Sequence, residues 1–277
     1  MTSHDMPNWI RILLLILTYV SFVPQLCHLA RRRGNASGIN LGYVLINLVA
    51  ATELFTLILL IALEFPLEAG SWIDFVNLAI IWILWLAIFL ICIMHHWHEN
   101  CPSTSHFIAF YAFLLIISVM PIILDAIVKS DPNYEPSFTE AVYIAIYFIV
   151  HIYIIIPIII ILSFVAYFLQ ARQIMARPPE SSADALSVVG VAFQVVVFSV
   201  LAATWYPGRL NSGSSKSTVL DWRIFGGCIP INHAVFAVEQ ALVLITLWCR
   251  RRGERRGNAN LPDETQPLIG SQQVLSS

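Results

Sequence analysis

Long apolar stretches separated by short polar segments dominate the chain. We place seven of them near residues 9–30, 41–63, 73–94, 106–128, 141–169, 185–206 and 226–248. A helix rises about 1.5 Å per residue, so roughly 20 apolar residues cross the hydrocarbon core of a bilayer. The segments between the stretches carry Gly, Pro, Asn and charged residues, which favour turns and helix ends. The pattern predicts an all-α membrane protein with seven transmembrane helices.

The fifth and the first stretches each differ from a simple, straight transmembrane span. The fifth is too long for one straight span, and we expect Pro157 to kink it because proline removes a helix hydrogen bond. The first is not typical of a cleaved signal peptide, because its apolar core is too long and three arginines follow it instead of a small-residue cleavage site. We therefore keep the first stretch as a true span.

Composition agrees with this pattern and excludes two classes of protein. Apolar residues make up 58% of the 277 residues and charged residues 12%, roughly half the charged fraction of a soluble domain. The net charge of −2 excludes a basic nucleic-acid binder. The five cysteines are an odd number and scattered, so they indicate neither a disulfide framework nor a Cys-x-x-Cys metal site.

The basic residues predict how the helices are oriented. Basic loops stay in the cytosol, and with the N-terminus on the opposite, lumenal side the cytosolic segments hold ten of the fifteen: Arg31, Arg32, Arg33, Arg172, Arg177, Arg250, Arg251, Arg252, Arg255 and Arg256. The other five are Arg11, Lys129, Arg209, Lys216 and Arg223. This distribution predicts a lumenal N-terminus and a cytosolic C-terminus.

The chain also contains an internal repeat. A shift of 145 positions sets Gln25 over Gln170 and Leu41 over Leu186, and in both places a long apolar run ends in Gln before a short basic loop. Residues 1–94 and 131–249 are predicted to form two three-helix repeats, with a linking helix region at 95–130. A single linking helix gives both repeats the same orientation, a 3+1+3 arrangement of parallel repeats. We expect the tail, residues 250–277, to be disordered.

The run Ser21-Phe22-Val23-Pro24-Gln25-Leu26, followed by a basic loop and Gly38-Ile39-Asn40-Leu41, resembles the PQ-loop repeat family. That family includes vacuolar and lysosomal amino-acid exporters and is related to the sugar-transporting SWEET proteins. The second copy departs from the motif, with Leu169-Gln170 in place of Pro-Gln, and the segment 232–240 is similar to a divergent fungal branch. The resemblance implies a proton-coupled transporter of small organic solutes, amino acids above all, in a vacuolar or lysosomal membrane.

Pro24, Gln25 and Gln170 are the candidate hinge residues. Proline loosens the helix by removing a backbone hydrogen bond, and the neighbouring Gln amide can satisfy the freed carbonyl. A kink that serves packing alone is the alternative interpretation.

Polar residues at membrane depth supply the other candidates. Glu53 and Glu239 lie about midway along the second and seventh stretches, at what we expect to be equivalent positions around a central cavity. Each is a candidate proton carrier, because hydrocarbon penalises a charged carboxylate. His233 is a candidate group titrating in an acidic lumen. Three neutral side chains are candidates for the substrate pathway: Asn47, Gln194 and Gln240. Hydrogen bonds that only brace helix packing remain the alternative for the two glutamates and the three neutral side chains. His151 and Asp125 are placed nearer the outer interface, in contact with water.

The tail contains Glu264, Leu268 and Ile269 in the order of an acidic dileucine sorting signal, which would bind a clathrin adaptor complex. The expected partners are thus a small solute, the lipid bilayer and this adaptor, with no nucleic acid, metal or cofactor.

Other functions are weaker alternatives. A PQ-loop protein that scrambles lipid or acts in trafficking without transporting solute is one, and a seven-helix receptor is less favoured because internal repetition is unexpected there. No enzyme motif occurs in the chain, such as His-Glu-x-x-His or Gly-x-Ser-x-Gly.

Overall fold

A computed structural model describes residues 6–31, 38–64, 69–98, 104–131, 138–176, 186–209 and 227–259. These ranges are helical apart from short turns and contain no strand. In chain order the helices are α1 (Asn8–Arg31), α2 (Leu41–Glu64), α3 (Ala69–His98), α4 (Thr104–Ser118), α5 (Met120–Lys129), α6 (Phe138–Val150), the π-helix η1 (His151–Ile155), α7 (Ile156–Met175), α8 (Val188–Arg209) and α10 (Ile229–Ala259). The prediction of an all-helical chain is confirmed.

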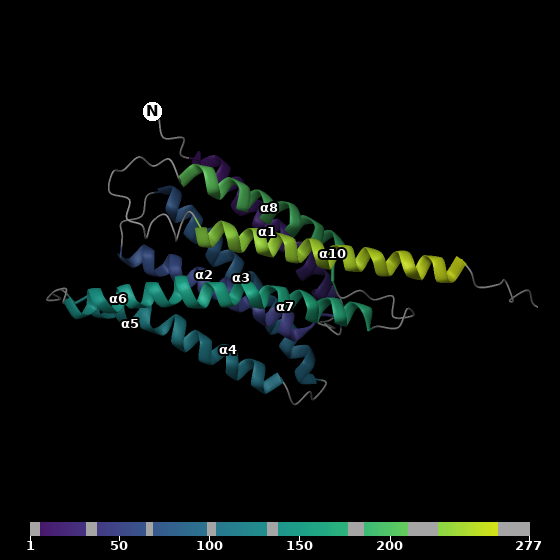
Figure 1. The fold of residues 1–277 in the computed structure, drawn as a ribbon, viewed down its shortest axis with the longest axis horizontal. Coiled ribbons are helices and arrows are strands. Elements are labelled where there is room, and N and C mark those ends of the chain that lie inside the picture. The colour runs from purple at the N-terminus through teal and green to yellow at the C-terminus, as the bar shows by residue number, and fades with distance from the viewer. Residues whose placement is uncertain are drawn as a thin grey trace, which may run out of the picture.

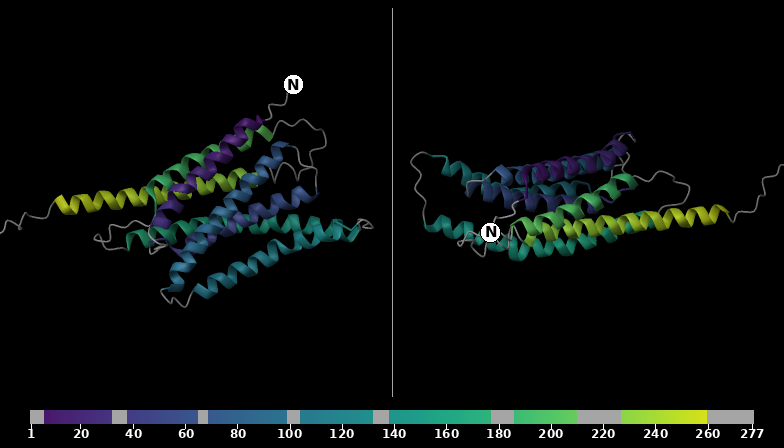
Figure 2. Two further views of the ribbon diagram at one scale, coloured as in Figure 1. Left: turned by 180° about the vertical axis from the view of Figure 1, so that it is seen from behind. Right: turned by 90° about the horizontal axis from the view of Figure 1, so that it is seen from above.

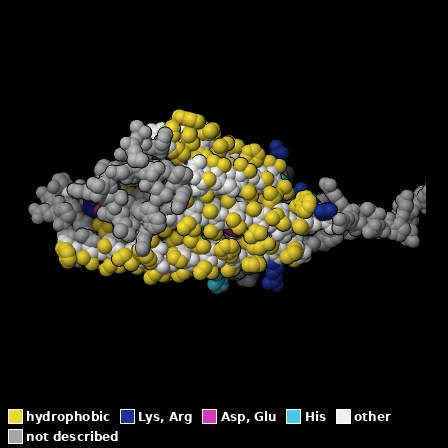
Figure 3. All heavy atoms as spheres, turned by 45° about the horizontal axis from the view of Figure 1, so that its top comes forward, with side chains coloured by type: hydrophobic (Ala, Val, Ile, Leu, Met, Phe, Trp, Pro, Cys, Tyr) yellow, Lys and Arg dark blue, Asp and Glu magenta, His cyan; other side chains and the backbone are white. Residues whose placement is uncertain are grey.

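In the described part of the chain, six helical segments are long and apolar enough to cross a membrane: α1, α2, α3, α4 with α5, α6 to α7 through η1, and α10. The sixth expected span corresponds to α8, whose described apolar segment, Val188–Thr204, is shorter. Hydrophobic side chains cover much of the described part of the face shown in Figure 3, and the Lys and Arg side chains seen there lie mainly toward one end. Such a surface fits contact with lipid, so the chain has the fold of a multi-pass membrane protein.

The helices run side by side in an elongated bundle, and α10 extends beyond its neighbours (Figures 1 and 2). Helix α3 packs against both α1 and α2, and α10 packs against both α7 and α8. Between these two trios, α1 contacts α8 and α2 contacts α7. Helix α4 lies outside the trios, against α2.

The starts of α2 and α8 are determined by local side chains. The Asn40 Oδ1 accepts hydrogen bonds from the backbone N–H groups of Gly42 (2.9 Å) and Tyr43 (3.3 Å). The Ser187 Oγ accepts one from the N–H of Gly190 at 3.2 Å. Asn and Ser are favoured at this position because they satisfy backbone donors that have no helical partner.

Two spans are interrupted within the membrane segment. Pro121 lies at the start of α5, directly after the break at Val119 that separates it from α4. Before Pro157, where we expected a kink, the helix contains the π-helix η1, in which the N–H of Ile156 donates to the carbonyl of His151, five residues earlier. A proline ring clashes with the carbonyl four residues before it, and a π-turn relieves that clash.

The tail differs from expectation in its first turns. Helix α10 continues through the arginines to Ala259, so residues 250–259 are helical where we expected disorder. Arginine is a good helix former, extending a formed helix is favourable, and cations near a helix C-terminus interact well with its dipole. Arg250 also donates to the carbonyl of Ile174 at 2.7 Å, which ties α10 to the end of α7.

Candidate functional site

A buried polar cluster joins α2 to α10. The Tyr43 Oη donates to Gln240 Oε1 (3.1 Å) and accepts from Gln240 Nε2 (2.8 Å). The Asn47 Nδ2 donates to Glu239 Oε1 (3.1 Å) and to the carbonyl of Tyr43 (3.0 Å). Asn47 and Glu239 are each 3% exposed, so the carboxyl of Glu239 is held inside the bundle and points away from lipid.

A small cavity of about 10 Å³ lies beside this cluster. Its polar lining comes from four helices: Gln25 on α1, Tyr43 on α2, Gln194 on α8 and Gln240 on α10. Apolar and aromatic side chains of α2, α3 and α8 and of the residues just before α2 and α8 complete the wall: Ile39, Val44, Trp85, Ile88, Leu186 and Val191. The volume holds about one water molecule and no organic solute. The structure therefore describes a closed bundle whose polar groups converge on a space too small for a substrate.

The two candidate hinge glutamines bind helices of the opposite trio. The Gln25 Oε1 accepts a hydrogen bond from the backbone N–H of Ser187 (2.7 Å), just before α8. The Gln170 Oε1 accepts one from the N–H of Asn40 (2.9 Å), just before α2, and its Nε2 donates to the carbonyl of Gly38 (3.0 Å). We expected these amides to satisfy a carbonyl of their own helix. Instead, their oxygens cap another helix, because the tight crossing brings that helix start within reach.

Glycines allow these two crossings. A Cβ on Gly190 would lie 3.3 Å from the backbone N of Gln25 and 3.5 Å from the Cβ of Pro24. A Cβ on Gly42 would lie 3.0 Å from a methyl carbon of Leu169. The first turns of α8 and α2 thus pack on the ends of α1 and α7, at the residues Pro24-Gln25 and Leu169-Gln170.

Four aromatic rings from four helices pack together between the trios. Phe22 of α1 packs edge-on against Trp85 of α3, with 5.7 Å between ring centroids, and lies 6.2 Å from Phe198 of α8. Phe236 of α10 completes the cluster, 5.8 Å from Trp85 and 4.4 Å from Phe198. His233 is buried against Phe198, with 5.5 Å between ring centroids.

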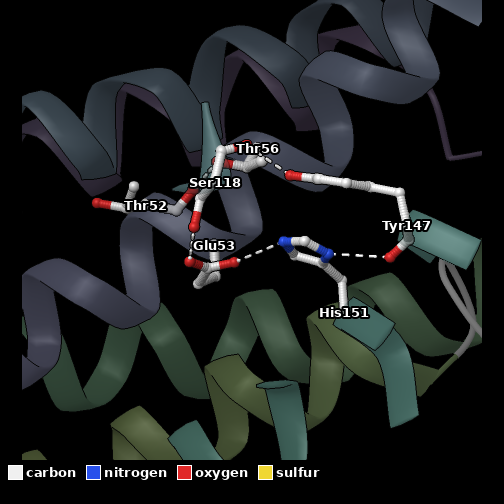
Figure 4. Close-up of polar contacts among 6 residues, drawn as sticks. All are labelled: Thr52, Glu53, Thr56, Ser118, Tyr147 and His151. Carbon is white, nitrogen blue, oxygen red and sulfur yellow. Dashed lines mark hydrogen bonds and ion pairs between the residues drawn. The ribbon is translucent and has the colours of Figure 1, made fainter. Parts of the chain in front are cut away.

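Glu53 lies in a different place from Glu239, although we expected equivalent positions around one cavity. Its carboxylate faces the α4–α5 break and η1 (Figure 4). Ser118 donates a hydrogen bond to Glu53 Oε1, and His151 Nε2 lies 3.3 Å from Glu53 Oε2. The two glutamates belong to separate networks because α2 turns one face to α10 and another to α4 and α7.

His151 is buried, which the sequence analysis missed. Its side chain is 4% exposed, whereas we placed it in contact with water near the interface. The available signal was the position of His151 within the long fifth stretch, six residues before Pro157. Asp125, which we also placed in contact with water, is 11% exposed and pairs with Lys129 at 2.9 Å near the end of α5.

Tyr43 was also missed as a site residue. It lies four residues before Asn47 and therefore on the same helix face, a spacing that would have indicated it. Glu264, Leu268 and Ile269 lie outside the residues that the structure describes. Within the described ranges, no group of three or more His, Cys, Asp or Glu side chains could hold a metal ion.

Comparisons of the chain with protein-family models, with curated proteins and with solved structures gave no match. Evidence on function therefore comes from the sequence and from the geometry of the helical bundle.

Proposed function

We propose that the chain is a membrane carrier of small organic solutes, built as two parallel three-helix repeats around a central path. The observation that carries this proposal is the reciprocal capping by Gln25 and Gln170. Each glutamine lies toward the end of the first helix of one trio and caps the second helix of the other. A two-fold axis between equivalent trios would produce such a reciprocal pair of hydrogen bonds.

Spacing along the second helices supports the same equivalence. Asn47 lies seven residues after the capped Asn40, and Gln194 lies seven residues after the capped Ser187. Both side chains are 3% exposed, and Gln194 lines the cavity beside the Asn47 cluster. In both trios, moreover, the third helix packs against the other two. The linking helix is then α4 with α5.

The polar cluster is the proposed solute site. Amide groups of Asn47, Gln194 and Gln240 offer donors and acceptors for a zwitterionic or hydroxylated solute such as an amino acid. The Glu239 carboxyl is a proposed proton carrier at the same site. Because the cavity is closed in this structure, a solute can enter only when the α1–α8 and α2–α7 contacts rearrange.

The proposed location is a vacuolar or lysosomal membrane with a lumenal N-terminus. Arginines at the end of α10 support a cytosolic C-terminus, because basic segments beside a span stay in the cytosol. The dileucine sequence at Glu264, Leu268 and Ile269 is the proposed address for an adaptor complex.

Uptake into proteoliposomes tests this function. We expect saturable uptake of at least one solute from a panel of amino acids, stimulated by an inward proton gradient. Glu239→Gln should abolish the stimulation, because the amide cannot carry a proton, and Gly227→Ala should transport normally, since its added Cβ meets open space.

Two outcomes would contradict the carrier. Uptake no faster than in protein-free vesicles, for protein that is folded by its unfolding transition, would refute transport of this solute class. Movement of a fluorescent phospholipid between leaflets without solute uptake would instead select the lipid-scrambling alternative.

A further inference from the structure

Glu53 lies where two interrupted spans meet, away from the cavity of the proposed carrier. Four residues form a closed loop of contacts there (Figure 4). Ser118, the last residue of α4, donates to Glu53 Oε1. Tyr147 Oη donates to the Ser118 carbonyl at 2.5 Å, and the Tyr147 carbonyl lies 2.9 Å from His151 Nδ1. His151 Nε2 returns to Glu53 Oε2 at 3.3 Å.

The contact at Nδ1 determines which nitrogen of His151 carries a hydrogen. A backbone carbonyl can only accept, so Nδ1 must be the protonated donor toward the Tyr147 carbonyl. In a neutral imidazole the other nitrogen, Nε2, then presents a lone pair. That lone pair faces Glu53 Oε2, which in a carboxylate also presents lone pairs.

One additional proton makes this contact attractive. It either converts His151 to an imidazolium that donates to the Glu53 carboxylate, or it sits on Glu53, which then donates to the imidazole. Glu53 Oε2 and His151 Nε2 have no other hydrogen-bond partner within the described part of the chain. Both side chains are at most 4% exposed, so bulk water does not reach this contact to donate a hydrogen bond to either atom.

We propose that Glu53 and His151 together form one buried site that binds a single proton taken from water. The site goes beyond the proposed carrier function, because it requires no solute and shares no residue with the cavity. Glu53 lies on α2, as do Tyr43 and Asn47, so α2 connects the two networks.

Other titratable groups around the pair are already engaged. Tyr147 of α6 donates to Ser118, and Tyr111 of α4 contacts Thr52 and Trp82. On α5, Asp125 and Lys129 pair with each other, and Lys129 also pairs with Glu64. Asp74 of α3 pairs with Arg11, and Glu239 of α10 accepts a hydrogen bond from Asn47. In the described ranges no Lys or Arg pairs with Glu53. His151 is thus the group there that shares a proton with it.

Loss of the proton would place a carboxylate against a lone pair in a buried site, and the two side chains would separate. Separation affects both interruptions at once, because the loop joins the end of α4 to the start of η1. π-Turns and proline breaks lack part of the regular helix hydrogen bonding, so they rearrange more readily than intact helix.

Nitrogen-15 NMR of histidine-labelled protein in nanodiscs tests the site directly. The His151 signals are assigned by their loss in His151→Gln. We expect the dependence of these signals on pH to differ between the wild type and Glu53→Gln, because the glutamine amide replaces the carboxylate that faces Nε2. Asp125→Asn, outside the loop, should leave the His151 titration unchanged.

The proposal is overturned if the His151 titration is the same in Glu53→Gln as in the wild type, because the two groups would then not share a proton. Should Glu53→Gln fail to fold, Ser118→Ala provides a second variant: it removes the donor to Oε1, leaves the pair in place, and should shift the titration. An unchanged titration in Ser118→Ala would count equally against the site. Since no solute enters this measurement, absence of transport would refute the carrier alone.

Discussion

At the scale of single residues, buried polar side chains find partners on other helices. Asn47 lies six residues after the start of α2 and Glu239 ten residues after the start of α10, and their hydrogen bond joins the two helices. A donor or acceptor left without a partner in hydrocarbon costs free energy, and shared bonds between helices avoid that cost. The buried polar side chains of Asn47 and Glu239 therefore connect α2 to α10.

Asn47→Leu should lower the free energy of unfolding by about 1–2 kcal/mol, because Glu239 loses a buried donor. The double variant Asn47→Leu with Glu239→Leu should recover part of this loss, since both polar partners are then replaced by apolar side chains. Thermal unfolding in detergent measures both. Effects that simply add would show that the two side chains are not coupled.

At the scale of helices, their starts and crossings depend on a few short contacts. Helices α2 and α8 both begin at an Asn or Ser cap, and each cap residue donates its own N–H to a glutamine of the other trio. Close crossing at Gly42 and Gly190 makes those bonds possible.

Gln25→Ala and Gln170→Ala should each reduce stability by about 1–2 kcal/mol, because each substitution leaves a backbone N–H without its acceptor. A loss is expected for both variants, since each oxygen accepts from the residue just before a helix of the other trio. Thermal unfolding provides the measurement. Thr204→Ala is the matched control, because that hydroxyl donates within its own helix. A loss in only one of the two variants would contradict equivalent roles.

Gly190→Ala should destabilise the protein by about 1–3 kcal/mol, since the added methyl overpacks against the backbone of Gln25 at 3.3 Å. Gly227→Ala, whose Cβ meets no atom within 4 Å, should cause no loss. Chemical or thermal unfolding measures the stability of both variants. An equal loss of stability in the two would mean that α1 and α8 do not pack this closely.

Helix positions could be predicted from the sequence better than helix interruptions. The expected range 41–63 matches α2 at Leu41–Glu64, because a capping Asn and a long apolar run define it. The sequence predicted a kink at Pro157 but not the π-helix. One extra residue in a turn changes the spacing of apolar and polar positions, and that change cannot be seen in a run where nearly all residues are apolar.

At the scale of the whole molecule, the described helices of the two trios pack closely together. Within the described residues, the cavity of about 10 Å³ beside the polar cluster and the four-ring aromatic cluster leave no room for a solute. A carrier with this structure must move α1 relative to α8.

A disulfide between Pro24→Cys and Gly190→Cys tests that movement. Their Cβ atoms would lie 3.5 Å apart, within the range of a disulfide. We expect oxidation to stop solute uptake and a reductant to restore it, with each single variant as control. Full uptake by protein shown to be cross-linked would place the gate elsewhere.

Length and polarity of the apolar runs determined roughly where the helices begin and end, because hydrocarbon requires every backbone donor to be satisfied within a helix. They also indicated polar residues at membrane depth that are buried in the bundle, Glu53 and Glu239 among them. Only the tertiary structure decided the pairings: Glu239 with Asn47, Glu53 with His151, and both Gln25 and Gln170 with the opposite trio. The physical reason is that a partner on another helix depends on which faces pack together, and spacing within one helix carries no information about that.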